Sequence, residues 1–137
     1  MSQNLKEYNS LFQPMIRGIS QRIRLDAVIL FGSRARGDAT LQSDYDIVVI
    51  GDFHEQFLDR LEWVLDYTPH VPTDVFCYTP AEFEKMFSTY RLTAIDAVGE
   101  GIVLFGGAFI RPFKARYADF VRRGLHKTTC TLVPPSN

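Results

Sequence analysis

The sequence predicts an α/β fold of the α+β kind: a mixed β-sheet of about four strands with helices packed against it, followed by a C-terminal helix. Short apolar runs rich in β-branched and aromatic residues alternate with longer segments whose apolar residues recur at helical spacing, and this alternation predicts helices layered on a sheet. Glycine and proline stand where one pattern changes to the other. Of the 137 residues, 46% are hydrophobic and 23% are charged, a balance that suffices for one folded core.

Four short apolar runs have the length and composition of buried strands. The expected strands cover residues 26–31, 45–50, 72–78 and 102–105. Because proline cannot donate a hydrogen bond to a neighbouring strand, Pro72 places the third strand near an edge of the sheet or stands at its first position. The stretch between the first two strands holds the residues with the strongest chemical signal.

Amphipathic patterns predict four helices. The expected helices cover residues 4–24, 51–67, 79–98 and 109–127. Pro14 interrupts the first helix or shifts its start. Thr79 and Pro80 are the residue types favoured at the N-cap and the first position of a helix, so they mark the start of the third.

The second predicted helix has a regular apolar stripe. Phe57, Leu61 and Leu65, with Val64 beside them, recur at helical spacing, so we expect this stripe to face the core. Trp63 lies off the stripe, and the sequence alone does not decide between partial burial and a contact with a partner.

We expect one domain over residues 1–127 and a loosely ordered tail over residues 128–137. The first predicted helix and the apolar stripe of residues 83–98 offer more apolar surface than one core face needs, so a homodimer is compatible with the sequence. The polar N-terminus does not resemble a signal peptide, and no apolar run approaches membrane length. We therefore expect a cytoplasmic protein that makes no membrane contact.

The turn after the first strand has the residues of a phosphate-binding site. Gly32 lets the backbone turn tightly or approach a ligand closely. Ser33 is a good N-cap, so we expect a short helix to begin there. Free N–H groups at a helix start favour an anion such as phosphate, and the guanidinium groups of Arg34 and Arg36 suit phosphate oxygens.

Two carboxylates follow this turn, with ten residues between Ser33 and Asp44. Asp44 and Asp46 stand at the front of the second strand, two positions apart, so they share a face. Like charges so close repel each other unless a cation lies between them, and Mg²⁺ takes oxygen ligands and bridges carboxylates to phosphates. Asp74, in the third strand, is the best candidate for the third carboxylate that two metal ions need.

The pattern Gly32-Ser33, ten residues, then Asp44-Tyr45-Asp46 resembles the signature of the DNA polymerase β-like nucleotidyltransferase superfamily. Its fuller form, with Arg34-Ala35-Arg36-Gly37, is similar to the minimal nucleotidyltransferases. The resemblance extends over about residues 20–107, which it implies to be the catalytic core. It implies a metal-dependent enzyme that moves a nucleoside monophosphate from a triphosphate, with ATP as the family-level expectation, to a hydroxyl.

The resemblance also implies roles for the acidic residues. Asp44 and Asp46 would hold Mg²⁺ against the triphosphate, and Asp74 would complete a second metal site and help deprotonate the incoming hydroxyl. Two Mg²⁺ ions about 4 Å apart, or Mn²⁺ in their place, stabilise both the attacking and the leaving oxygen of an in-line displacement.

The residues of the turn would act on the phosphates. Gly32 and Ser33 would bind the β- and γ-phosphates through backbone N–H groups. Arg34 and Arg36 would neutralise the departing pyrophosphate, or either would point to solvent.

The acceptor is not identified by any motif. Many minimal nucleotidyltransferases are encoded beside an all-helical HEPN protein, often a ribonuclease toxin, and act as antitoxins by adding AMP to a tyrosine of that partner. The resemblance therefore implies a HEPN-type partner. Two alternatives stay open: a small-molecule nucleotidyltransferase of the aminoglycoside-modifying type, which would need a second helical domain, and a non-catalytic module that neutralises a partner by contact.

Charge argues against a nucleic-acid partner. The net charge is −1, so the surface as a whole has no broad attraction for nucleic acid. The last predicted helix sets six basic residues against Asp119: Arg111, Lys114, Arg116, Arg122, Arg123 and Lys127. We interpret this segment as a solvated helix face rather than as a binding patch for nucleic acid or an acidic protein.

Overall fold

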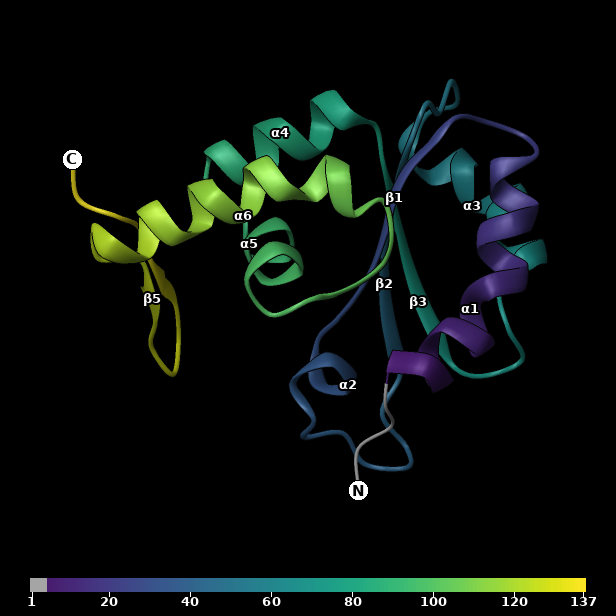
Figure 1. The fold of residues 1–137 in the computed structure, drawn as a ribbon, viewed down its shortest axis with the longest axis horizontal. Helices are drawn as coiled ribbons and strands as arrows, with labels where there is room; N and C mark the ends of the chain where they lie inside the picture. The colour runs from purple at the N-terminus through teal and green to yellow at the C-terminus, as the bar shows by residue number, and fades with distance from the viewer. Residues whose placement is uncertain (1–4) are drawn as a thin grey trace.

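Four strands form the central sheet in the computed structural model, which describes residues 5–137 (Figure 1). The strands are β1 (Leu25–Phe31), β2 (Tyr45–Gly51), β3 (Thr73–Tyr78) and β4 (Ile102–Phe105). Their order is β3-β2-β1-β4, with β2 and β3 parallel and the other neighbours antiparallel. The sheet is therefore mixed, as the sequence predicts, and β3 lies at an edge.

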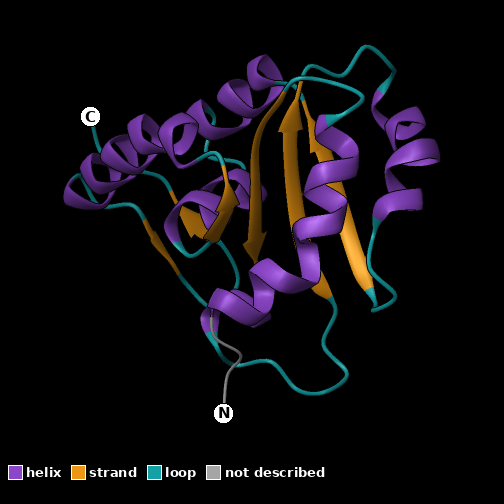
Figure 2. Cartoon of the chain, turned by 45° about the vertical axis from the view of Figure 1, so that its right-hand side comes forward, coloured by secondary structure: helices purple, strands orange, loops and turns teal. Residues whose placement is uncertain are grey.

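Helical segments cover both faces of this sheet (Figure 2). One face carries α1 (Leu5–Ser20) and the continuous helical segment η1 (Phe57–Arg60), α3 (Leu61–Val64) and η2 (Leu65–Tyr67). The other face carries α4 (Pro80–Ser88), α5 (Leu92–Gly99) and α6 (Gly107–Arg122). A short helix, α2 (Ser33–Arg36), follows β1 at one end of the sheet.

Two apolar cores lie between these layers because strand side chains alternate between the faces. Val28 and Leu30 of β1 belong to the core under α1, whereas Ala27, Ile29 and Phe31 belong to the core under α4, α5 and α6. The apolar faces of α1 and of residues 83–98 are buried in these cores. Most of the apolar surface that made a homodimer compatible with the sequence is therefore buried within the chain, and a homodimer stays a prediction.

The first helix differs from its prediction at both Pro14 and its C-terminus. The helix passes through Pro14 and ends at Ser20, not at residue 24. Phe12 and Met15, on either side of the proline, are fully buried. Their packing offsets the one hydrogen bond that the proline cannot donate. Residue 4, where we expected the helix to begin, lies outside the described residues.

The helix predicted over residues 51–67 begins only at Phe57, and the predicted inward stripe is right only in part. Val64 is buried and Leu61 packs against the core, as predicted. Phe57 and Leu65 are exposed instead, whereas Arg60 and Trp63 are buried. The segment starts and ends as 3₁₀-helix, which has three residues per turn, so residues four apart do not stay on one face.

The helix predicted over residues 79–98 is two helices. Thr79 caps α4 through a capping box with Glu82, as expected for this start. Tyr90 then adopts a left-handed backbone with φ 60°, which separates α4 from α5. Its ring packs on Phe120 of α6 with centroids 5.2 Å apart. Packing against α6 thus overrides the continuous helical pattern of the sequence.

A hairpin lies at the end of the chain, where the sequence predicts a loose tail over residues 128–137. The last helix stops at Arg122, and a hairpin of β5 (His126–Lys127) and β6 (Leu132–Val133) follows. Ser136 N–H donates to the Arg123 carbonyl at 2.7 Å, which ties the end of the chain back to α6. Residues 128–137 thus contribute the second strand of this hairpin and its contact with α6.

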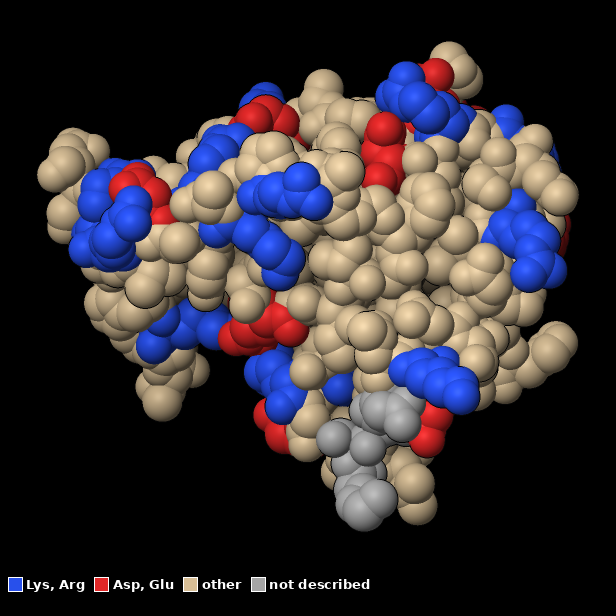
Figure 3. Space-filling view, viewed as in Figure 1, with Lys and Arg blue, Asp and Glu red and all other residues tan. Residues whose placement is uncertain are grey.

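The basic residues near the C-terminus are mostly paired. Arg116 pairs with Glu84, Arg123 with Asp119, and Lys127 with Asp96 and Glu100. Figure 3 shows acidic side chains beside the basic ones on the face that carries α6. This neutralisation supports the solvated face over a nucleic-acid patch. No helix among residues 5–137 is both long and apolar enough to span a bilayer.

Candidate active site

The predicted site residues meet at one end of the sheet. The C-terminal end of β1 and the N-terminal ends of β2 and β3 lie there side by side. Phe31 is the register partner of Asp46, and Asp46 is the register partner of Asp74. Residues in register on neighbouring strands present their side chains to the same face. The sheet therefore brings together two carboxylates that are 28 positions apart in the sequence.

The pKa of Asp46 reflects its closeness to the other two carboxylates. Burial raises the pKa of Asp46 above its ordinary value, the negative charges of Asp74 and then Asp44 raise the same pKa further, and Arg36 partly lowers it. Asp44 is exposed and directly precedes β2. Asp44, Asp74 and Arg36 thus all lie within electrostatic reach of Asp46.

Gly32 is required by both its backbone and its surroundings. Its φ is +76°, and a Cβ at this position would collide with Oδ2 of Asp46. The carboxylate is therefore packed directly against the turn. Gly32, and not Ser33, occupies the N-cap position of α2; Ser33 is the first helical residue, and its side chain does not cap the helix. The predicted helix start is right, but the residue that supplies the cap is wrong because only glycine fits there.

Arg34 is engaged within the protein. Its Nη2 donates to the Ser43 carbonyl at 2.9 Å, and its guanidinium lies 4.3 Å from the ring centre of Tyr45. Tyr8 of α1 donates to the Arg34 carbonyl at 3.1 Å. Arg34 thereby ties the loop before Asp44 to the turn after Gly32.

Arg36 lies at the other side of the turn. It contacts Asp38 and Glu100, each at 3.3 Å, and Glu100 in turn accepts from Lys127 at 2.8 Å. Burial opposes ionisation of Glu100, but its hydrogen bonds from Lys127 and Arg36 hold its pKa below the ordinary value. A chain of charges therefore connects α2, the end of α5 and the C-terminal hairpin. No sequence motif pointed to Glu100 or to Lys127, since both act only through tertiary contacts.

The carboxylates fit a hard divalent cation by chemistry and by placement, but they are not yet gathered around one point. Carboxylate oxygens are the ligands that Mg²⁺ prefers, and Asp46 and Asp74 are neighbours across the sheet. Within residues 5–137, no group of three or more Asp, Glu, His or Cys side chains converges as it stands on a metal position.

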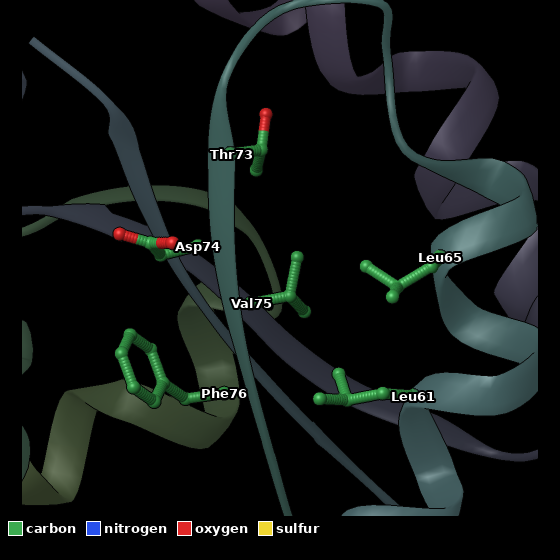
Figure 4. A pocket seen from close by; sticks show the side chains of 6 residues that line it. All are labelled: Leu61, Leu65, Thr73, Asp74, Val75 and Phe76. Carbon is green, nitrogen blue, oxygen red and sulfur yellow. The ribbon is translucent and has the colours of Figure 1, made fainter.

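A hollow of about 270 Å³ lies beside the site, against the free side of β3 (Figure 4). It is lined by Leu61, Leu65, Thr73, Asp74, Val75 and Phe76. The sequence did not predict it, because it exists only where half-buried Leu61 and exposed Leu65 face the edge strand.

Comparisons with known proteins identify the family of the chain. A model of the nucleotidyltransferase domain family matches residues 15–104 of the chain. The chain belongs to this family, and the predicted class of enzyme, a nucleotidyltransferase, is confirmed.

Individual relatives are more distant. A candidate protein adenylyltransferase from Methanocaldococcus jannaschii is 44% identical over 48 residues, which cover 35% of this chain and 43% of that protein. The match thus spans less than half of that relative. The crystal structure of a candidate nucleotidyltransferase from Sulfolobus solfataricus has a TM-score of 0.52 at 20% identity, covers 72% of this chain and 80% of its own, and confirms the fold. A toxin–antitoxin structure with AMP-PNP has a TM-score of 0.48 at 18% identity, with 85% and 86% coverage.

Proposed function

We propose that the chain transfers AMP from ATP to a hydroxyl group on a partner protein. The observation that carries the proposal is the register of Asp46 with Asp74, directly beside the Gly32 turn. This arrangement puts carboxylates next to a backbone turn suited to phosphate. The name of the Methanocaldococcus relative, a candidate protein adenylyltransferase, supports AMP and a protein acceptor.

Asp44, Asp46 and Asp74 would hold two Mg²⁺ ions, or Mn²⁺ in their place. Bound there, the ions supply charge neutralisation at the triphosphate and at the attacking oxygen. The raised pKa of Asp46 supports this role, because a cation would relieve the repulsion that its neighbours impose.

The turn would receive the β- and γ-phosphates. Gly32 and Ser33 offer main-chain N–H groups, and Arg36 would turn from Glu100 toward the pyrophosphate. Arg34 is better placed to brace the loop than to touch a phosphate, because its guanidinium is held by Ser43 and Tyr45.

In the reaction, the acceptor oxygen bonds to the α-phosphorus of ATP while the bond from that phosphorus to the bridging oxygen breaks. Pyrophosphate leaves, and the acceptor proton passes to the Asp74 carboxylate. The residues of this chain contribute positioning and charge rather than a covalent intermediate.

We further propose a HEPN-type helical protein as the acceptor, with this chain as its antitoxin in the cytoplasm. The resemblance of the Gly32–Asp46 motif to the minimal nucleotidyltransferases supports this pairing. The aminoglycoside-type alternative would need a second helical domain, whereas within residues 5–137 α6 covers the sheet and the hairpin packs on α5.

Titration calorimetry with non-hydrolysable ATP and GTP analogues, with and without Mg²⁺, tests the proposal. We expect metal-dependent binding that the Asp44→Asn/Asp46→Asn double variant loses. An Asp59→Asn variant, which changes an exposed aspartate on η1, should bind like the wild type. Absence of metal-dependent binding to the folded wild type would contradict the proposal.

A second experiment separates the enzyme from the contact-only module. The double variant is tested for neutralisation of the native partner. Catalysis predicts that neutralisation is lost together with AMP transfer, whereas neutralisation that survives without transfer would favour contact alone.

A further inference from the structure

The part of the β3 edge that lies beside the site is available for pairing with another strand. Tyr45 N–H donates to the Pro72 carbonyl at 2.9 Å, so Pro72, Asp74 and Phe76 direct their main-chain groups toward β2. Because these groups alternate along a strand, those of Thr73 and Val75 point outward. Outside helices and strands, no main-chain hydrogen bond among residues 5–137 involves either residue.

The far part of the same edge is closed. The outward carbonyl of Cys77 accepts from Arg60 Nη1 at 2.9 Å. Arg60 is itself held by Glu82 at 2.6 Å and is 4% exposed. The available edge is therefore short, and it flanks Asp74 on both sides.

The two faces of this open edge differ. Figure 4 shows Val75 directed toward Leu61 and Leu65, across the hollow, while Asp74 and Phe76 point to the opposite side of β3. Leu65 is 49% exposed although it is apolar and lies over the hollow. One face of the edge is thus apolar and empty, and the other carries the carboxylate that completes the proposed metal site.

A strand added at this edge would use both faces at once. Side chains of a strand alternate, so one residue would lie beside Asp74 while its two neighbours enter the hollow. Glu62 and Asp66, both exposed on the helical segment that borders the hollow, form no ion pair within the described chain. Their negative charges favour a basic incoming segment.

We propose that the acceptor hydroxyl is presented by an extended, basic segment of a partner protein that pairs with Thr73 and Val75. The hydroxyl-bearing residue lies beside Asp74, and the apolar residues next to it fill the hollow between Leu61, Leu65 and Val75. This inference rests on the proposed function and deepens it, since it states the conformation and flanking chemistry of the acceptor. Strand addition at a free edge provides affinity through main-chain bonds and specificity through alternate side chains.

Synthetic peptides test the inference. The first probe is Lys-Lys-Val-Xaa-Val-Lys-Lys, in which Xaa is Ser, Thr or Tyr. A second has Asn in place of both Val residues, and a third is N-methylated at its three central amides, which removes the main-chain donors and keeps the side chains. Transfer of labelled AMP to each peptide is measured with Mg²⁺ and ATP. We expect the first peptide to be modified at least about tenfold faster than the other two, because only it can both pair and fill the hollow.

Two matched variants locate the effect on the protein. Leu65→Arg puts a bulky cation over the hollow, and Leu92→Arg makes the same change on α5, where the leucine is 51% exposed. We expect Leu65→Arg to lower transfer to the first peptide about tenfold and Leu92→Arg to change it less than about twofold. Both variants should bind the ATP analogue like the wild type.

The outcomes are distinct. Equal modification of the three peptides, or equal transfer by the two variants, would overturn the inference. No transfer to any peptide despite metal-dependent ATP binding would also overturn it and leave the proposed function standing, whereas loss of ATP binding would contradict the proposed function itself. Light scattering that shows a wild-type dimer and a Leu65→Arg monomer would assign the edge to a second copy of this chain.

Discussion

The turn at Gly32 and the edge at Thr73 and Val75 flank the same carboxylates but are built in opposite ways. At the turn, the chain fills its own space: Gly32 touches Asp46, and Arg34 is held by Ser43 and Tyr45. At the edge, main-chain groups and an apolar hollow stay open. Under the proposed function, this chain would determine where the nucleotide sits, whereas another molecule would complete the acceptor side.

Removal of the carboxylate between the two regions should have the largest effect. Asp46→Asn should lower AMP transfer by about 10²–10³-fold or more, because it removes the negative ligand that faces both the turn and Asp74. Radiolabel transfer measures the change, with Asp59→Asn as control. Less than about tenfold loss would mean that Asp46 is not a central ligand.

The same substitution should stabilise the fold near neutral pH. The pKa of Asp46 is raised in the folded state, so the folded protein binds its proton more tightly than the unfolded chain. Stability then falls as pH rises from the unfolded pKa through the folded pKa, and above that window the carboxylate is a net cost. Asp46→Asn removes the negative charge and therefore this loss of stability. Thermal melts at pH 7 and pH 4 should show a gain only at the higher pH.

Arg60 closes the far part of the β3 edge. Replacement of Arg60 should have the next largest effect, which is on the free energy of unfolding. Arg60→Met removes a buried guanidinium from the Cys77 carbonyl and from Glu82, whose side chain is 42% exposed, and should cost about 2 kcal/mol of unfolding free energy. Arg116→Met is the matched control: Arg116 also lies 2.6 Å from a glutamate and packs on two rings, but its pair is exposed. The control should cost no more than about 1 kcal/mol by urea unfolding. Similar costs would mean that burial of Arg60 adds nothing.

Two glycines sharpen the account of the turn. Gly32→Ala and Gly37→Ala both place a side chain at positive φ, and each should cost about 1–3 kcal/mol of stability. Only the Cβ at Gly32 would meet Asp46; at Gly37 it meets nothing within 4 Å. We therefore expect Gly32→Ala to weaken binding of the ATP analogue about tenfold or more, and Gly37→Ala to leave it nearly unchanged. Equal weakening would assign the effect to backbone strain alone.

Sequence patterns predict the turn better than the edge, and locality explains why. The Gly32, Asp44 and Asp46 spacing is set by one strand, one turn and the next strand, so it is visible in the sequence. The four strands and the start of α4 at Thr79 are likewise local and are confirmed.

The features that were missed depend on distant parts of the chain. The spacing of Phe57 and Leu65 predicts an α-helix with these side chains facing the core. The 3₁₀ turns direct both side chains outward instead, and the hollow beside β3 lies where Leu65 faces the strand. The break at Tyr90 depends on Phe120, thirty positions further on. Propensity and periodicity contain no information about such partners.

The smallest effect should come from Glu100, which connects the turn to the C-terminal hairpin. Glu100→Gln weakens the contacts to both Arg36 and Lys127, whereas Asp96→Asn weakens only a contact to Lys127. If Glu100 positions Arg36 for the triphosphate, Glu100→Gln should change KM for ATP about two- to fivefold with little change in kcat, and Asp96→Asn should change neither.

A pH series distinguishes positioning from mere support of the fold. The pKa of Glu100 is lowered in the folded state, so its stabilising effect is present above the ordinary pKa and is lost as pH falls through the folded value. Near pH 7 the wild type should therefore be more stable than Glu100→Gln, and the difference should vanish in acid. A KM shift at pH 7 in a variant that remains fully folded by circular dichroism would assign Glu100 to positioning of Arg36. An unchanged KM would mean that Glu100 only holds the hairpin in place. ATP binding at the Gly32 turn would then not depend on the C-terminal region.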